Sequence, residues 1–134
     1  MGPKPVPRAI RSLIAAMNSE DIDALSAVLA DDLEFLDARG QRIVGKANAL
    51  EMARRLFDSG IEYRLQVGSV ARVGGQLLMR GKATSNEPAF CNDLLWRVHV
   101  SGRQIDFWET HGSQVEQTLL QALVPDLVQR SVAA

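Results

Sequence analysis

The sequence has a single cysteine, almost no net charge and no long apolar run, and each shortage excludes a class of protein. With Cys91 alone, the chain forms no internal disulfide. Its 15 basic and 16 acidic residues are interleaved and leave a net charge of −1, so there is no basic field to hold a phosphate backbone. No apolar run approaches the length of a membrane span. We therefore expect neither a nucleic acid nor a membrane as a partner.

The length and the ends of the sequence predict one domain with short additions. A chain of 134 residues is long enough to bury a core of its own. Residues 1–7 contain three prolines and predict an arm outside any helix. We expect the domain to cover residues 8–113, and a helical extension of it to cover residues 114–134. No charged and apolar leader with a cleavage site opens the sequence, which predicts a cytoplasmic protein.

The hydrophobic pattern changes along the chain from a helical period to a strand period. Apolar residues at helical spacing predict three helices, over residues 10–17, 22–29 and 46–57. Alternation and glycine-containing turns predict strands over residues 33–37, 42–44, 61–73, 76–84, 90–100 and 103–111. Ser113 and Glu116 have the spacing of a capping box and predict a last helix over residues 114–123. This order predicts an α+β fold in which helices close one side of a pocket.

Three stretches carry a likeness to a known family: LIAAMNSEDIDALSAVLADDLEFLD, IVGKANALEMARRLF and SGRQIDFWETHG. Over residues from about 8 to 113 the chain resembles the nuclear transport factor 2-like superfamily, particularly its ketosteroid isomerase and SnoaL-like polyketide cyclase branches. The resemblance implies a cone-shaped, cystatin-like fold. In that fold three N-terminal helices pack on a strongly bent mixed sheet, mainly antiparallel, and a C-terminal helix follows. The fold hosts several functions, so the reaction has to be argued from single residues.

Asp37 ends the first predicted strand on the same face as Leu33 and Phe35. By the resemblance it falls where ketosteroid isomerases carry their general base. A carboxylate flanked by apolar groups is protonated more readily and can take a proton from a carbon next to a carbonyl. The alternative is structural, because Asp37 and Gly40 occupy the first and fourth positions of a type I turn. Both interpretations remain open from the sequence.

The resemblance leaves the other half of that site incomplete. Ketosteroid isomerases hold the enolate oxygen with a tyrosine on the first helix and a protonated aspartic acid on a later strand. The tyrosine position is Leu13 here, which argues against steroid isomerisation itself. Asp93 is the candidate for the aspartic acid, but Leu94 takes its place if the strand is counted back from its turn. Tyr63 offers a phenol donor in place of the missing one, unless it only bonds to the backbone.

Strand alternation places Ile105, Phe107, Glu109 and His111 on one face of the last strand and Trp108 on the other. Glu109 resembles in position an acidic residue that many SnoaL-like proteins and limonene epoxide hydrolase carry, where it acts on a water. His111 beside it is a natural proton shuttle. We therefore expect both on the pocket wall as acid or relay, unless they are strand-end side chains in solvent. Trp108 should face outward and contribute to a homodimer through the sheet.

These residues predict a pocket for a small hydrophobic ligand, without a cofactor. The candidate catalytic residues are Asp37, Glu109, His111 and Asp93. The residues expected to contact the ligand are Leu13, Met17, Phe35, Phe57, Tyr63, Leu95 and Phe107. Two histidines on different strands, without H-x-H or C-x-x-C spacing, do not predict a metal site.

The leading function predicted from the sequence is proton transfer on a hydrophobic carbonyl compound, by an isomerase, a cyclase or a dehydratase. One alternative is a non-catalytic domain of the same fold that binds a ligand or dimerises. A further alternative is water activation of the epoxide hydrolase kind. Convergence of Asp37, Glu109 and His111 in one closed cavity would favour an enzyme, whereas a collapsed or purely apolar pocket would favour the binding domain.

Overall fold

A computed structural model describes residues 6–112, 115 and 117–129 of the chain. The helices are α1 (Arg8–Asn18), α2 (Ile22–Val28), α3 (Lys46–Asp58) and α4 (Leu119–Leu123). The strands are β1 (Leu29–Leu36), β2 (Arg42–Val44), β3 (Tyr63–Val73), β4 (Gln76–Ser85), β5 (Asn92–Ser101) and β6 (Gln104–His111). A short 3-10 helix, Pro88–Phe90, joins β4 to β5. The predicted α+β fold is confirmed.

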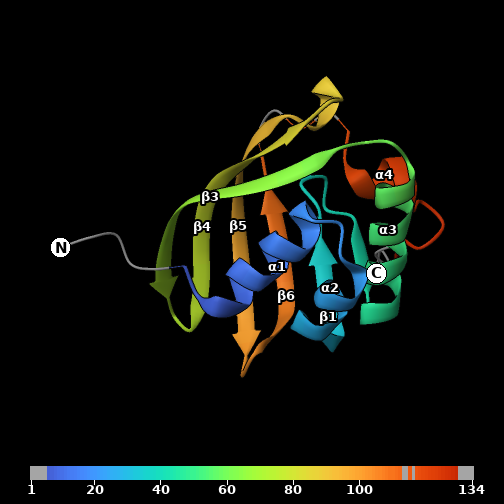
Figure 1. Ribbon diagram of the computed structural model, residues 1–134. Helices are drawn as coiled ribbons and strands as arrows, with labels where there is room; N and C mark the ends of the chain where they lie inside the picture. The colour runs from blue at the N-terminus through green and yellow to red at the C-terminus, as the bar shows by residue number, and fades with distance from the viewer. Residues whose placement is uncertain (1–5, 113–114, 116, 130–134) are drawn as a thin grey trace, which may run out of the picture.

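The strands form one sheet in the order β2-β1-β6-β5-β4-β3. All neighbours are antiparallel except β1 and β6, which run parallel, so the sheet is mixed but mainly antiparallel. Figure 1 shows α1 and α2 across one face of the sheet, α3 and α4 beside β1, and the long strand β3 arching over the helices. We call the face under the helices the inner face and the opposite one the outer face.

Asn18 ties the end of α1 to β3. Its amide nitrogen donates to the carbonyl of Leu65 at 3.0 Å, and its amide oxygen accepts from the Leu65 N–H at 2.9 Å. The side chain thus satisfies both backbone groups of Leu65 as a neighbouring strand would. This connection holds the buried face of α1, which includes Leu13 and Met17, against the bent strand.

A β-bulge in β6 determines which of its side chains lie under the helices. The pairing with β5 shifts at Asp106, which has no partner of its own on that strand. Because the extra residue reverses the alternation, Ile105 and Trp108 are both buried on the inner face, at 0% and 4% exposure. Phe107 and Glu109 lie on the outer face. The expectation that Trp108 faces outward is therefore wrong, since strict alternation cannot anticipate a bulge.

Gly81 in β4 makes room for the bend of the sheet. A Cβ atom at this position would lie 2.0 Å from the carbonyl oxygen of Gln66 and 2.8 Å from the ring of Trp96. The facing strand β3 carries a bulge of its own between Val67 and Ser69. Only glycine lets β3, β4 and the indole meet at this point.

The last helix is shorter than the sequence predicted. Helix α4 begins at Leu119, and Thr118 caps it in a reciprocal capping box with Gln121. The predicted capping pair Ser113 and Glu116 lies outside the described residues. Arg55 of α3 holds the end of α4, because its guanidinium donates to the carbonyl of Leu123 at 2.9 Å. Across the described part of the chain, no helix combines the length and the hydropathy needed to cross a membrane.

Candidate functional site

An apolar cavity of about 80 Å³, which we call the internal cavity, lies between the helices and the inner face of the sheet. The rings of Trp96 and Trp108 meet in its wall, with centroids 5.9 Å apart and planes tilted by 50°. Its lining consists of Leu13, Met17, Leu25, Leu29, Leu33, Phe35, Ala49, Met52, Ala53, Tyr63, Leu65, Trp96, Trp108, Thr110 and Leu119. The side chains that bring polar atoms to this lining are Tyr63, Thr110 and the two tryptophans, each of which has one indole N–H. The site therefore suits a ligand that is mostly hydrocarbon.

A second, smaller cavity of about 50 Å³ adjoins the first, and we call it the Asp37 cavity. Phe35, Tyr63, Thr110 and Leu119 border both spaces, so they form the partition between them. Asp37 lies in the wall of the smaller cavity and is 7% exposed. The predicted general base is therefore next to the apolar cavity, but not inside it.

Both carboxylate oxygens of Asp37 accept hydrogen bonds. Oδ1 accepts from the backbone N–H groups of Arg39 and Gln41 at 2.8 and 2.9 Å. Oδ2 accepts from the hydroxyl of Thr118 at 2.6 Å. The carbonyl of Asp37 also accepts from the N–H of Gly40, as a turn requires. Three donors hold the carboxylate in the turn and against the start of α4, so the structural interpretation of Asp37 describes these contacts well.

Tyr63 is the phenol that faces this region. It begins β3, is half buried and borders both cavities. Burial raises the pKa of its phenol well above the ordinary value of 10, so the hydroxyl remains a hydrogen-bond donor over the physiological range. Among residues 6–112, 115 and 117–129, none hydrogen-bonds to this hydroxyl. Tyr63 can therefore offer a donor to a ligand in either cavity.

Glu109 and His111 lie together, but on the outer face of the sheet. His111 Nε2 is 2.6 Å from Glu109 Oε1, and Arg97 Nε is 3.1 Å from the same oxygen. Burial raises the pKa of Glu109, but the hydrogen bond with His111 and the charge of Arg97 outweigh it and hold that pKa below the usual 4.5. Neither side chain lines the internal cavity or the Asp37 cavity. Asp37, Glu109 and His111 thus do not converge in one site.

The remaining sequence candidates divide between the two faces. Asp93 is exposed, whereas Leu94 is buried and borders the Asp37 cavity, which settles the register left open by the sequence. Of the seven residues expected to contact a ligand, four line the internal cavity: Leu13, Met17, Phe35 and Tyr63. The other three do not: Phe57, Leu95 and Phe107. Leu95 is 47% exposed on the outer face, and Phe107 lies there under Arg97.

Sequence reasoning missed most of the cavity lining, and three of the residues that it missed shape the site. Trp96 and Trp108 form the cavity wall, and Thr118 binds Asp37 from the other end of the chain. An inward Trp96 follows from counting strand β5 back from its turn, but Trp108 depends on the bulge. The contact of Thr118 has no local signal, because it arises only when α4 packs against α3. Within the described ranges, no group of three or more potential metal ligands occurs.

Comparisons with known proteins agree with this architecture. The family model for the SnoaL-like domain matches residues 10–118. A proposed polyketide cyclase from Sinorhizobium meliloti superposes with a TM-score of 0.70 at 22% identity, over 79% of this chain and 95% of that one. An LEH-like epoxide hydrolase from M. tuberculosis superposes with a TM-score of 0.69 at 19% identity, over 79% of this chain and 80% of that one. No curated protein matches the chain significantly.

A third structure resembles more of the chain and contains a ligand. It is a hypothetical protein with a ketosteroid isomerase-like fold from Catenulispora acidiphila, in complex with trimethylamine. Its TM-score is 0.71 at 18% identity, over 91% of this chain and 98% of that one. At such identities the likeness shows the fold and not the reaction. Because the family model covers most of the chain, the protein belongs to the SnoaL-like domain family of the nuclear transport factor 2-like superfamily.

Proposed function

We propose that the protein binds a small hydrophobic molecule in the internal cavity, with the Tyr63 hydroxyl bonded to a polar atom of that ligand. One observation carries the proposal: a phenol borders a mainly apolar cavity between the helices and the sheet. Few polar groups in an apolar wall are typical of sites that orient a ligand by one or two hydrogen bonds. A ketone or aldehyde carbonyl is the acceptor that suits this donor.

The size of the cavity limits the ligand. Its 80 Å³ is smaller than the engineered cavity of about 150 Å³ that holds benzene. Met17 and Met52 lie in the wall, and their unbranched side chains repack more easily than those of other apolar residues. We therefore expect a ligand no larger than one substituted ring, which enters as these methionine side chains move aside, rather than a steroid.

The two tryptophans make this proposal testable, because they are the only ones in the chain and both line the cavity. Acetophenone should change their fluorescence with a saturable dependence on concentration, and ethylbenzene should do so too. Tyr63→Phe should weaken the binding of acetophenone by roughly 2- to 10-fold, which corresponds to the loss of one hydrogen bond, and should leave the affinity for ethylbenzene unchanged. Leu95→Ser, on the outer face, is the control and should alter neither. An unchanged spectrum with both probes, or equal losses for both, would contradict the proposal.

Proton transfer by Asp37 is the second candidate, because its buried carboxylate shares the smaller cavity with Tyr63. The Thr118 hydroxyl donates to Oδ2 at 2.6 Å and so occupies one acceptor site of the candidate base. Thr118→Val would free that site for a substrate and should increase the rate of α-proton exchange. Asp37→Asn should abolish that exchange. Deuterium exchange into acetone and other small ketones measures both effects, and exchange that survives Asp37→Asn would rule this candidate out.

Glu109 and His111, on the outer face, have no part in either candidate function. Glu109, His111 and the exposed Asp93 are separated from both cavities by the sheet itself. An acid or relay role for them would require a substrate on the outer face. Water activation by Glu109 has the same requirement, so we do not extend the proposal to epoxide hydrolysis.

A further inference from the structure

A large cleft lies away from the internal cavity, at the end of the sheet where two hairpin turns meet the start of α1. Its volume is about 560 Å³, within the usual range for sites of small organic ligands. The turns β3–β4 and β5–β6 contribute Gly75 and Gly102, and α1 contributes its first residues. None of its lining residues lines the internal cavity. We call it the arginine cleft.

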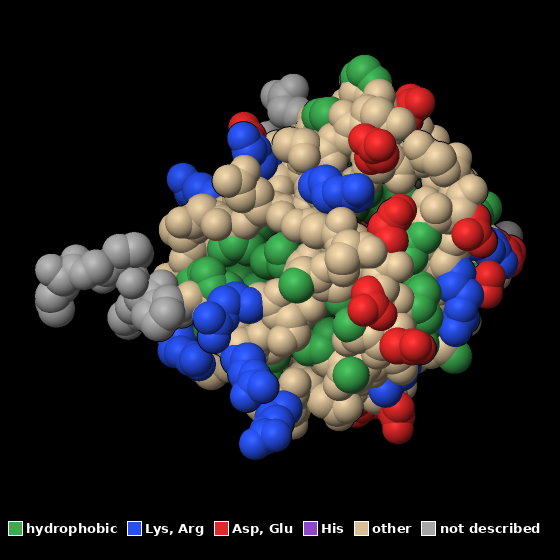
Figure 2. Space-filling view, viewed as in Figure 1, with side chains coloured by type: hydrophobic (Ala, Val, Ile, Leu, Met, Phe, Trp, Pro, Cys, Tyr) green, Lys and Arg blue, Asp and Glu red, His purple; other side chains and the backbone are tan. Residues whose placement is uncertain are grey.

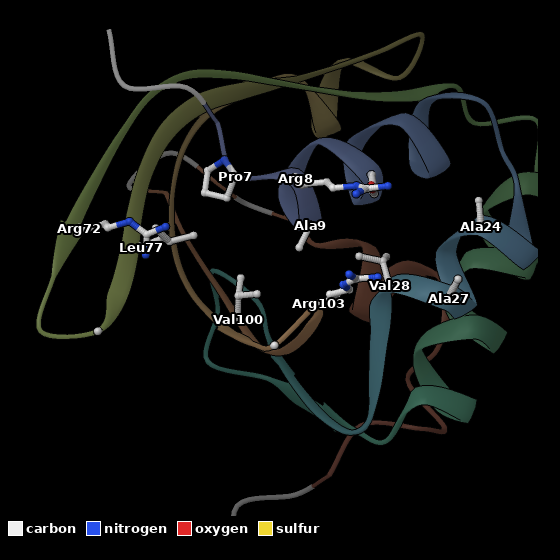
Figure 3. A pocket seen from close by; sticks show the side chains of 13 residues that line it. Pro7, Arg8, Ala9, Ala24, Ala27, Val28, Arg72, Leu77, Val100 and Arg103 are labelled. Carbon is white, nitrogen blue, oxygen red and sulfur yellow. The ribbon is translucent and has the colours of Figure 1, made fainter.

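Three arginines line this cleft: Arg8, Arg72 and Arg103. They come from three different elements, and no aspartate or glutamate lines the cleft with them. Figure 3 shows the Arg72 side chain across the pocket from those of Arg8 and Arg103. An anion bound in this hollow would be attracted by all three positive charges.

Among the described residues, none of these three arginines has an acidic partner, in contrast to three other arginines of the surface. Arg42, Arg55 and Arg97 each lie within 3.5 Å of a carboxylate. Within the part of the chain that the structure describes, Arg8 and Arg72 form no ion pair or side-chain hydrogen bond, and neither does Arg103. Their donors are thus available to carboxylate or phosphate oxygens, which the planar guanidinium binds in a bidentate manner.

The start of α1 adds a further positive contribution. Pro7 occupies its cap position, no side chain caps the first turn, and that turn has no acidic residue. The first N–H groups of an 11-residue helix are therefore free of side-chain partners beside the cleft. This field supplements that of the arginines and has the same sign.

The floor of the cleft is apolar. Ala9, Val28, Leu77 and Val100 line it below the arginines. Figure 2 shows hydrophobic side chains in a hollow at the left of the molecule, with Lys and Arg side chains along its lower edge. A free inorganic anion would leave this apolar floor exposed to water. A molecule with an anionic head and an apolar tail would cover both parts.

We infer that the arginine cleft binds a small amphipathic anion, an apolar molecule bearing a carboxylate or a phosphate. Its head would lie between the guanidinium groups of Arg72, Arg8 and Arg103, and its tail would lie on the apolar floor. The inference does not depend on the proposed function of the internal cavity. It gives the molecule a second ligand site, which recognises its ligand by positive charge, whereas the internal cavity is mainly apolar.

Octyl phosphate, octanoate and octanol test the inference, because they share a tail and differ in the head. Titration calorimetry should show binding of the two anions, weakened by added salt, and little binding of octanol. Arg72→Gln and Arg103→Gln should each weaken the binding of both anions by roughly 5- to 10-fold. Arg54→Gln, an exposed arginine of α3 outside the cleft, is the matched control and should change nothing. The preferred anion distinguishes a phosphate from a carboxylate ligand.

The position of binding is measured independently by amide chemical shifts in NMR. Shifts at Ser12, Gly75 and Gly102 would support the cleft, and Ala27→Trp, which narrows it from an exposed position, should remove them. The inference would be overturned by shifts centred on Thr110 in the internal cavity. It would also be overturned by equal binding of octanol, by equal losses in Arg54→Gln, or by no binding of either anion at millimolar concentration. Binding to anionic vesicles without binding of the soluble anions would replace the small ligand by a membrane surface.

Discussion

At the scale of single residues, Asp37 joins two segments that are far apart in the sequence. Its Oδ1 closes the turn after β1, and its Oδ2 receives the hydroxyl of Thr118 at the start of α4. Oδ2 accepts only this one hydrogen bond and has a second lone pair, so it can accept a substrate proton while Thr118 remains bound. Asp37 therefore attaches the start of α4 to the turn after β1 whether or not it also acts as a base.

The first prediction concerns the stability that this carboxylate provides. Asp37→Asn keeps the oxygen that accepts from the turn but places an amide donor against the Thr118 hydroxyl, so a charge-assisted bond is lost. We expect the free energy of unfolding to fall by about 1–3 kcal/mol, measured by urea denaturation. Thr118→Ser, which keeps the hydroxyl, is the control and should remain near the wild type. A wild-type stability for Asp37→Asn would show that the Thr118 contact contributes little.

The second prediction concerns acid stability through Glu109. Its pKa is lower in the folded protein than the usual 4.5, so folding favours the ionised form. This contribution is present above pH 4.5 and disappears as the pH falls through the lowered pKa. Urea denaturation from about pH 5 to pH 3 should therefore show a shallower loss of stability for Glu109→Gln than for the wild type. Asp93→Asn, an exposed change on the same face, should follow the wild type, and parallel curves for all three proteins would argue against this origin.

At the scale of elements, two local irregularities shape the sheet. The bulge at Asp106 turns Trp108 inward and Glu109 outward, while Gly81 lets β3 bend over Trp96. Both features act on the cavity wall through an indole. The internal cavity is thus a consequence of how β4, β5 and β6 depart from regular pairing.

The third prediction tests the bend. Gly81→Ala would bring a Cβ within 2.0 Å of the Gln66 carbonyl oxygen, so the strands must separate or Trp96 must move. We expect a loss of about 1–3 kcal/mol or more in the free energy of unfolding, with a change in tryptophan fluorescence. Gly68→Ala is the control at the same bend, because its Cβ would lie 3.4 Å from the nearest atom, a tight but tolerable contact. Equal effects of the two substitutions would show that the bend does not depend on Gly81.

The sequence was sufficient to locate the helices and strands, but it was insufficient to assign side chains to the two faces of the sheet. Hydrophobic periodicity and glycine turns located the strands and α1 to α3, because those signals are local. They could not show the extra residue at Asp106. The bulge changes which side chains face inward, but it leaves no mark in the amino-acid composition of the strand. They also could not show that Thr118 meets Asp37, because that contact depends on tertiary packing. Leu13, Met17, Phe35 and Tyr63 do line the internal cavity, and their contact with a ligand stays a prediction, whereas Glu109 and His111 lie on the other face of the sheet.

At the scale of the whole molecule, helices cover one face of the sheet and leave the other face open. The inner face lies under the helices, whereas the outer face leaves Leu78 and Leu95 at 42% and 47% exposure. These leucines border a hollow of about 460 Å³ together with Val70, Arg80 and Arg97. Large apolar side chains gathered on one face are typical of a surface that another protein covers. We propose a second copy of this chain as that protein.

The fourth prediction tests a homodimer through the outer face. Sedimentation at micromolar concentration should show a dimer, and Leu95→Lys should weaken association by placing like charges in the interface. Val73→Lys is the control, because Val73 is 58% exposed at the end of β3, away from that hollow. Trp108→Glu is unsuitable, since Trp108 is buried and its loss would damage the core. A wild-type protein that sediments as a monomer would contradict the prediction.

The parallel pairing of β1 with β6 also determines when the protein can fold. Strand β1 has only β2 and β6 as neighbours, so its central hydrogen-bonding partner lies at the far end of the sequence. On a ribosome, the segment carrying α1 to α3 must wait for residues 104–111 before the sheet beneath those helices is complete. Non-local pairing of this kind slows folding, because a long loop is closed before its contacts are gained. The nascent chain therefore exposes the apolar side of its early helices for most of its synthesis, when chaperones have the greatest opportunity to act on it.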